Sequence, residues 1–461
     1  MATQTVITNG TLIDGTGNQP QSSMSVLIQD GRFSAIARSG ELTPPEGAEV
    51  IDAAGKWILP GLVNGNVHLL DGIMMMGIGG VEYLSRFEGE FHKVIEESAQ
   101  IALKGGVTTV FDTWNALRPV LKARDRIAGG LVPGARIFCA GNIVGMGGPF
   151  QPDFVMQARQ IMSTTFADRM DALFEAGVGR RLSTLPPEEV RAIIRDYIST
   201  GVDFVKVAVS DHLLGLLGFR NPYFTFSPRV LQVIVDEVRA AGLPLLTHTT
   251  SIESLNTAVE HNADLMIHAT MTGQVPIPDE TLQKIVDKGL WSEVQPSTLT
   301  HQSHLDTTKH PWADFAGGVH HQNDVRMIRA GAGLVLGTDA GCTLPDVLND
   351  LSEGELFERP FTLGEDHFHW LTAMTEKGMN PMAAILANTS NVAKAYGKID
   401  DYGTIEVGKV GDVVVLDADP LVDIKNMRRI STVVQAGNVI DVGALPSEPM
   451  VTKQRLYDDN V

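Results

Sequence analysis

The chain has 461 residues, of which 55 are acidic and 36 are basic, so its formal net charge is −19. This length allows one large domain and a smaller one, each with a core that needs no disulfides. The negative charge repels phosphate backbones, which excludes nucleic acid as an expected partner. No stretch approaches the roughly 20 apolar residues of a membrane-spanning helix, so no membrane association is expected.

The cysteines and the N-terminus indicate the compartment. Cys139 and Cys342 are the two cysteines, and neither lies in a CxxC or Cys/His motif. This argues against a disulfide framework and for a reducing environment. Residues 1–7 contain no basic segment leading into an apolar run, as an export signal would. We therefore expect a cytoplasmic protein.

Short apolar strands are expected at both ends of the chain. They lie at residues 5–13, 24–28, 32–37 and 50–58, with turn signals at Asn9-Gly10, Asp30-Gly31 and Gly55-Lys56. Such dipeptides favour hairpins, which predicts a small antiparallel sheet. Similar strands recur within residues 403–416 and at 433–440. Because either set alone is too thin to bury a core, we expect one small β-sandwich domain built from both termini.

Between the two ends, the chain repeats an amphipathic helix, a glycine stop and an apolar strand that ends in a polar residue. In one repeat the helix starts near Pro187, stops at Gly201 and precedes a strand carrying Lys206. One strand starts at Leu62, and seven more are expected at residues 106–112, 135–139, 202–209, 243–248, 264–268, 291–295 and 333–339. Eight strands that alternate with helices predict an α/β fold.

The specific prediction is a (β/α)8 TIM-type barrel. A doubly wound open sheet is the alternative, but no GxGxxG motif follows the first strand. We expect residues 1–60 to form the N-terminal part of the β-sandwich and residues 61–398 the barrel. Residues 399–445 would complete the sandwich, and residues 446–461 would form a tail.

Polar side chains end several of the expected barrel strands. They are Asn66, His68, Lys206, His248, His268 and Asp339. A barrel gathers these strand ends into one ring, on the face where the catalytic groups of this fold lie. Imidazole and carboxylate groups are good ligands for divalent metals, and an amide oxygen is a weaker one. Each residue alone has an ordinary structural explanation, but the set predicts a metal site.

Lys206 needs a separate explanation because valines flank it on a strand that is expected to be buried. Burial disfavours the charged amine and lowers its pKa. A neutral amine can react with carbon dioxide to give a carbamate, which is negatively charged and can bind a metal. We therefore hypothesise that Lys206 is carboxylated.

Together these features resemble the amidohydrolase superfamily over essentially the whole chain. The resemblance includes the split β-domain, the segment Leu59-Pro60-Gly61-Leu62, the lysine and the two histidines of the middle strands, Gly337-Thr338-Asp339 and residues 403–420. It implies one or two divalent metals, with ligand roles on His68, Lys206, His248, His268 and Asp339. It also implies a homo-oligomer.

Two asparagines depart from the pattern of the superfamily. Asn66 stands where the first histidine of the strand-one pair is usual, and Asn64 stands where an aspartate is common. This Asn-x-His variant is similar to a small subgroup of phenylurea and molinate (thiocarbamate) hydrolases. Loss of one imidazole favours a single ion held chiefly by His248 and His268. We expect zinc, with cobalt, manganese and iron as alternatives.

The resemblance implies a metal-dependent hydrolase of urea, carbamate or thiocarbamate bonds in neutral, apolar small molecules, such as phenylurea or thiocarbamate herbicides. Metal-activated water would attack the carbonyl, and Asp339 would be the general base. His268 or His68 would help to stabilise the oxyanion. One alternative is a dipeptidase or N-acyl amino acid amidohydrolase, in which Arg180 or Arg181 could hold a substrate carboxylate. Another is a non-catalytic scaffold homologue.

Overall fold

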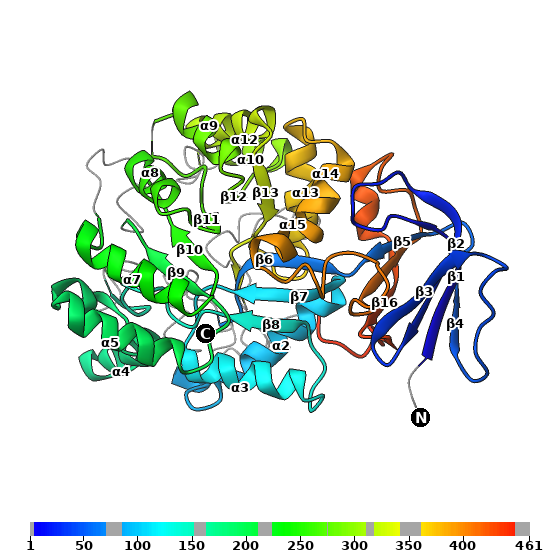
Figure 1. Cartoon of the computed structure of the whole chain (residues 1–461), viewed down its shortest axis with the longest axis horizontal. Coiled ribbons are helices and arrows are strands. Elements are labelled where there is room, and N and C mark those ends of the chain that lie inside the picture. The colour runs from blue at the N-terminus through cyan, green and yellow to red at the C-terminus, as the bar shows by residue number, and fades with distance from the viewer. Residues whose placement is uncertain are drawn as a thin grey trace, which may run out of the picture.

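The structure is a computed structural model that describes residues 4–70, 85–151, 163–210, 224–273, 275–309, 318–341 and 361–447. These ranges form a mixed α/β protein with two parts (Figure 1). Strands from the two chain ends lie together on the right of the view, and helices surround the parallel strands on the left.

One sheet joins the two ends of the chain. Its strands are β1 (Gln4–Leu12), β2 (Gln21–Gln29), β3 (Arg32–Arg38), β4 (Glu49–Asp52), β5 (Trp57–Pro60), β15 (Val413–Leu416), β16 (Ile430–Gln435) and β17 (Asn438–Val439). β5 runs parallel to β1 and antiparallel to β15, and so links the N-terminal and C-terminal strands. The sheet is mixed, because β4 also pairs in parallel with β1.

One of the predicted turns in this sheet is confirmed and another is wrong. Asp30 and Gly31 connect β2 to β3 with φ angles of 51° and 77°, as a tight hairpin requires. Asn9-Gly10 is not a turn, because β1 continues through it with a shift in register between Ile7 and Gly10. The left-handed backbone of Asn9, with φ 65°, instead accommodates a bulge.

The predicted strands of the middle region form two parallel sheets. The first contains β6 (Leu62–His68), β7 (Val107–Asp112), β8 (Arg136–Cys139) and β14 (Ala340–Gly341). The second contains β9 (Val205–Ala208), β10 (Leu245–His248), β11 (Leu265–Ile267), β12 (Trp291–Val294) and β13 (Gly333–Leu336). The strands therefore lie where the sequence predicts them, but their ladders do not form one closed barrel.

The two parallel sheets meet at both edges through short contacts. At one edge Val144 forms an isolated parallel bridge with Val207. At the other, Thr338, which follows β13, donates its N–H to the Asn66 carbonyl of β6 at 3.0 Å, and the chain continues into β14, which pairs with β6 within the first sheet. β13 ends at Leu336 and strand pairing resumes at β14, directly after Asp339, whose left-handed backbone with φ 59° does not fit regular strand pairing.

Helices cover the outside of the parallel strands. They are α2 (Phe91–Lys104), α3 (Leu117–Ala128), α4 (Thr164–Glu175), η3 (Arg180–Thr184), α5 (Pro187–Ile198), α7 (Pro228–Ala240), α8 (Ile252–Glu260), α9 (Asp279–Asp287), α10 (Leu299–Thr308), α12 (Gly318–Ala330), α13 (Asp366–Glu376), α14 (Pro381–Ala387) and α15 (Ser390–Ala395), with η6 (Ile424–Arg428) beside the mixed sheet. α7 begins after Ser227, whose side chain accepts a hydrogen bond from the Val230 N–H. Among the described helices, none has the length and apolar character needed to cross a bilayer.

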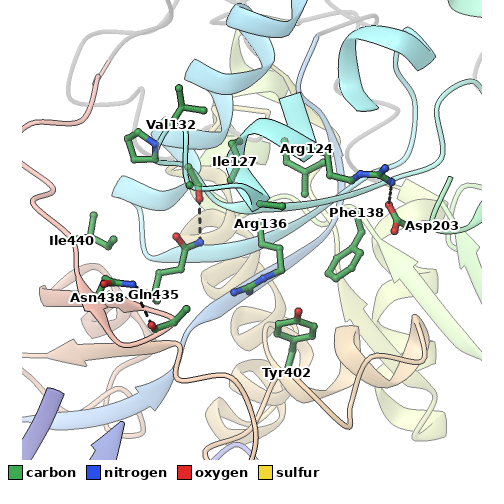
Figure 2. A pocket seen from close by; sticks show the side chains of 16 residues that line it. Arg124, Ile127, Val132, Arg136, Phe138, Asp203, Tyr402, Gln435, Asn438 and Ile440 are labelled. Carbon is green, nitrogen blue, oxygen red and sulfur yellow. Dashed lines mark hydrogen bonds and ion pairs between the residues drawn. The ribbon is translucent and has the colours of Figure 1, made fainter. Parts of the chain in front are cut away.

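A cavity of about 730 Å³ lies between the α3–β8 region and the β16–β17 hairpin (Figure 2). Its charged groups already have protein partners. Arg124 pairs with Asp203 at 3.0 Å, and Arg136 pairs with Asp412 at 2.8 Å. The six predicted site residues are absent from its walls. The cavity thus belongs to the junction between the two parts of the protein.

Gly61 at this junction provides a test of the packing. Its N–H donates to the Asp412 carbonyl at 2.9 Å, and an added Cβ would lie 2.7 Å from Thr108 Cγ2 and 2.8 Å from Asp412 Cβ. We expect Gly61→Ala to lower the free energy of unfolding by about 1–3 kcal/mol, because these buried neighbours have little room to move. Chemical denaturation measures the change. The matched control is exposed Gly443→Ala, whose added Cβ would meet only Asp441 Oδ1 at 3.2 Å. Equal stability of the two variants would contradict this packing.

Candidate active site

Three strand ends bring His68, His268 and Asp339 together. His68 Nε2 lies 2.7 Å from Asp339 Oδ1, and His268 Nε2 lies 3.8 Å from Asp339 Oδ2. The three side chains are no more than 5% exposed. The Asp339 carboxylate therefore lies between two imidazoles in a buried setting.

His248 and Trp114 pack against this group. The rings of His248 and His268 have centroids 4.9 Å apart and are nearly perpendicular, at 84°. Trp114 contacts His68 edge to face, with centroids 5.8 Å apart, and its Nε1 donates to Asn142 Oδ1 at 2.8 Å. Neighbouring rings thus restrict the orientation of the imidazoles.

Asn66 and Lys206 are connected to each other through Thr113. Lys206 Nζ donates to Thr113 Oγ1 at 3.0 Å, and the Thr113 hydroxyl donates to Asn66 Oδ1. The Asp339 N–H donates to the Asn66 carbonyl at 2.8 Å, which ties this pair to the histidine–aspartate group. All six predicted residues therefore lie in one connected region, although Asn66 and Lys206 turn their polar atoms towards Thr113.

Two members of the site have unusual backbones. His268 and Asp339 each have φ 59°, directly after β11 and shortly after β13. Residues other than glycine rarely adopt this region, which costs about 1–3 kcal/mol and is found preferentially at functional sites. The strain turns both side chains at the strand ends, where the sequence predicts the metal site.

Charges within the site hold Asp339 ionised. Burial alone would raise the pKa of its carboxyl group, but the charges of His68 and His268 and the hydrogen bond from His68 hold the pKa well below its usual value. For Lys206, burial outweighs the effect of the neighbouring charges on the pKa. Burial lowers the pKa of its amine to about 8, although the negative charges of Asp339, Glu293 and Asp112 oppose this shift.

The prediction from sequence omitted two buried carboxyl groups at the site. Glu293 lies on β12 with its side chain 0% exposed, and Asp112 ends β7. Burial raises the pKa of Glu293 to about 8, and the charge of Asp339 acts in the same direction. Burial also raises the pKa of Asp112 to about 7, against the hydrogen bond from Asn115. A charged residue within an apolar strand was a usable signal for Glu293, as it was for Lys206.

The donor groups fit a divalent cation by their chemistry. Buried imidazoles and an ionised carboxylate are the ligands that borderline metals such as zinc prefer. Within the described ranges, no three His, Cys, Asp or Glu side chains are arranged to hold an ion as they stand. His68 and Asp339 contact each other instead, at 2.7 Å. The site thus has suitable ligands but lacks a preformed cage.

Comparison with known proteins decides the family. The amidohydrolase family profile matches residues 57–441, which is most of the chain. The chain belongs to the amidohydrolase family. The resemblance inferred from the sequence is therefore confirmed, and members of this family generally depend on divalent metals.

Two solved structures resemble this amidohydrolase over its whole length. Molinate hydrolase is 65% identical with a TM-score of 0.95, and the match covers 100% of this chain and 99% of that one. Phenylurea hydrolase B is 50% identical with a TM-score of 0.94, covering 98% and 100%. Imidazolonepropionase of Geobacillus sp. (strain WCH70) is more distant, at 24% identity over 443 residues, 90% of this chain and 89% of that protein.

The raised pKa values predict how pH affects the stability of the metal-free amidohydrolase. The folded chain keeps protons on Asp112 and Glu293 up to about pH 7 and about pH 8, where the unfolded chain has already lost them. The free energy of unfolding should therefore fall as pH rises from about 5 to about 8, most steeply below about pH 7, where the folded chain holds both protons and the unfolded chain has lost them. Denaturation in the presence of a chelator measures this slope.

Two variants isolate the contribution of Glu293 to that slope. Glu293→Gln should make the slope shallower, because the amide has no proton to lose. The control Glu237→Gln should keep the slope, because hydrogen bonds from Arg195 and Arg191 lower the Glu237 pKa despite the opposing effect of burial. An unchanged slope in Glu293→Gln would contradict the assignment.

Proposed function

We propose that this amidohydrolase cleaves urea, carbamate or thiocarbamate bonds in neutral, apolar small molecules such as phenylurea or thiocarbamate herbicides. The observation that carries the proposal is its likeness to molinate hydrolase and phenylurea hydrolase B, at 65% and 50% identity over nearly the whole of each chain. The cluster of His68, His248, His268 and Asp339 would be the site at which these bonds are cleaved. A cytoplasmic location and a homo-oligomeric state remain predictions from the sequence.

We also propose that the two parallel sheets form one (β/α)8 barrel across residues 61–398, capped by a β-sandwich from residues 1–60 and 399–445. The strand order β6-β7-β8 and β9 to β13 supports this proposal. The Val144–Val207 bridge and the hydrogen bond from the Thr338 N–H to the Asn66 carbonyl would be the two joins. Such a barrel would place the candidate site at the C-terminal face of its strands.

The proposed metal centre is a single divalent ion, with zinc as the first choice and cobalt, manganese or iron as alternatives. His248, His268 and Asp339 would hold it, with His68 beside them. Lys206, whose pKa burial lowers to about 8, is suited to carboxylation. Asn66 would be at most a weak ligand, because its side-chain oxygen already accepts the Thr113 hydroxyl. When bound, the metal supplies Lewis-acid activation of water and of the substrate carbonyl.

The protein groups would supply the proton transfers. Asp339 is held ionised, so as general base it can accept the proton of the attacking water and deliver it to the leaving nitrogen or sulfur. His68 lies beside Asp339, where its Nε2 can donate a hydrogen bond to the oxygen that becomes negatively charged, whereas His268 would act there as a metal ligand. Burial of the three groups strengthens these interactions, because the local dielectric constant is low.

A substrate panel with metal removal tests the proposal. We expect hydrolysis of N-aryl ureas or thiocarbamates, loss of activity with a chelator, and recovery with one specific divalent metal. Acyl dipeptides test the alternative of a dipeptidase, for which the candidate carboxylate-binding residues Arg180 and Arg181 lie exposed in η3. Preferred cleavage of acyl dipeptides would contradict the proposal, and absence of any metal-dependent hydrolysis would favour a scaffold protein.

Asp339→Asn tests the assignment of the general base. The amide keeps the shape of the side chain but cannot accept the proton, so turnover should fall by about 10²–10⁴-fold. The metal content of the purified variant should stay close to that of the wild type, because the histidines remain. Parallel loss of metal and activity would instead make Asp339 chiefly a ligand.

A further inference from the structure

Glu293 lies beside the candidate metal ligands but outside the ligand set that the sequence predicts. Its Oε2 accepts a hydrogen bond from the His268 backbone N–H at 2.8 Å and lies 3.6 Å from His268 Nδ1. His268 Nε2, at the other edge of the ring, lies 3.8 Å from Asp339 Oδ2. The imidazole of His268 therefore has a carboxylate facing each of its two nitrogens.

Glu293 and Asn66 converge beside Gly337. A Cβ added to Gly337 would lie 2.5 Å from Glu293 Cγ and 2.7 Å from Asn66 Cβ, so only glycine lets the two side chains approach. Glu293 Oε1 and Asn66 Nδ2 are both buried and form no hydrogen bond of normal geometry within the described structure, although a weaker hydrogen bond from Asn66 lowers the pKa of Glu293 against the effect of burial. A buried carboxylate with so few hydrogen bonds is costly unless a positive charge compensates it. When a cation is bound and Glu293 is ionised, its negative charge thus lies where asparagine replaces the usual imidazole.

We propose that Glu293 is a positioning residue for the bound metal: it fixes the His268 ring with Nε2 towards Asp339 and supplies the compensating charge beside Asn66. This inference rests on the metal-dependent function proposed above. A carboxylate behind a metal-binding histidine fixes the tautomer and orientation of the ring and makes the histidine a stronger ligand. The Oε2 contact with the His268 backbone holds Glu293 in place for this role.

Cobalt binding to the full-length, chelator-stripped protein tests the inference without any substrate. Glu293→Gln keeps the shape of the side chain and removes its charge. Its affinity for Co²⁺, measured by competition with a coloured chelator, should fall by about 10–100-fold, because the ring of His268 is no longer fixed. The visible spectrum of the bound Co²⁺ should also change, which a general loss of stability would not cause.

Glu237→Gln is the matched control for removing a buried carboxylate. Glu237 is 5% exposed and pairs with Arg191 and Arg195, away from the site. This variant should bind Co²⁺ with the affinity and spectrum of the wild type. Glu293→Asp keeps the charge on a shorter side chain, so its affinity should lie between those of the wild type and Glu293→Gln.

The outcomes separate this inference from the proposed function. Wild-type affinity and spectrum in Glu293→Gln would overturn the role of Glu293 and leave the metal-dependent function intact. A wild-type chain that binds no Co²⁺ or Zn²⁺ would overturn both. Thermal unfolding of the metal-free variants checks their folding. If Glu293→Gln fails to fold, Glu293→Asp decides, since a shortened side chain with unchanged affinity and spectrum would overturn the inference.

Discussion

The contact between His68 and Asp339 is the interaction on which the site depends. It joins the end of the first parallel strand, β6, to Asp339 in the segment between β13 and β14, with 2.7 Å between Nε2 and Oδ1. A backbone hydrogen bond connects the same two segments, because the Asp339 N–H donates to the Asn66 carbonyl at 2.8 Å. Asn64 Nδ2 adds a bond to Thr338 Oγ1, also at 2.8 Å. The same contacts therefore connect the two sheets and assemble the candidate active site.

This arrangement concentrates charge in a buried region. Asp112, Glu293 and Asp339 supply three carboxyl groups near a single amine, that of Lys206, which is 1% exposed. Burial of charged groups is unfavourable unless they are paired or neutralised. In the metal-free chain, protonation of Glu293 and Asp112 relieves part of this imbalance, as their raised pKa values of about 8 and about 7 show. A divalent cation would balance the same charges without protonation.

The sequence predicts the strands well because each is a short apolar run that ends at a polar residue. Lys206 is recognisable because a charged lysine between valines on a buried strand is unfavourable unless a partner or a function compensates it. Glu293 carries the same signal on β12, but its neighbours are Asn66 of β6 and Gly337, which follows β13. Such proximity depends on how the strands are arranged in space, so the one-dimensional pattern does not reveal it.

The local sequence also fails to predict the structure where the backbone conformation is unusual. The left-handed φ angles of His268 and Asp339 follow from contacts between strands, because no glycine or turn motif occupies these positions. The break after β13 and the separation into two sheets have the same origin. At Asn9-Gly10 the local sequence strongly predicts a turn. The segment instead forms a bulge, because β1 continues to pair with the neighbouring strand β2. The departures from prediction thus arise where long-range contacts override local preference.

The central claim is that strand-end side chains from distant parts of the sequence hold one catalytic cation. Anomalous X-ray scattering from a crystal of the metal-loaded protein tests this most directly. The account predicts one strong anomalous peak, with nitrogen atoms of His248 and His268 and an oxygen of Asp339 each about 2.0–2.2 Å away. A peak bound by other side chains, or none at these residues in a metal-loaded active enzyme, would contradict it.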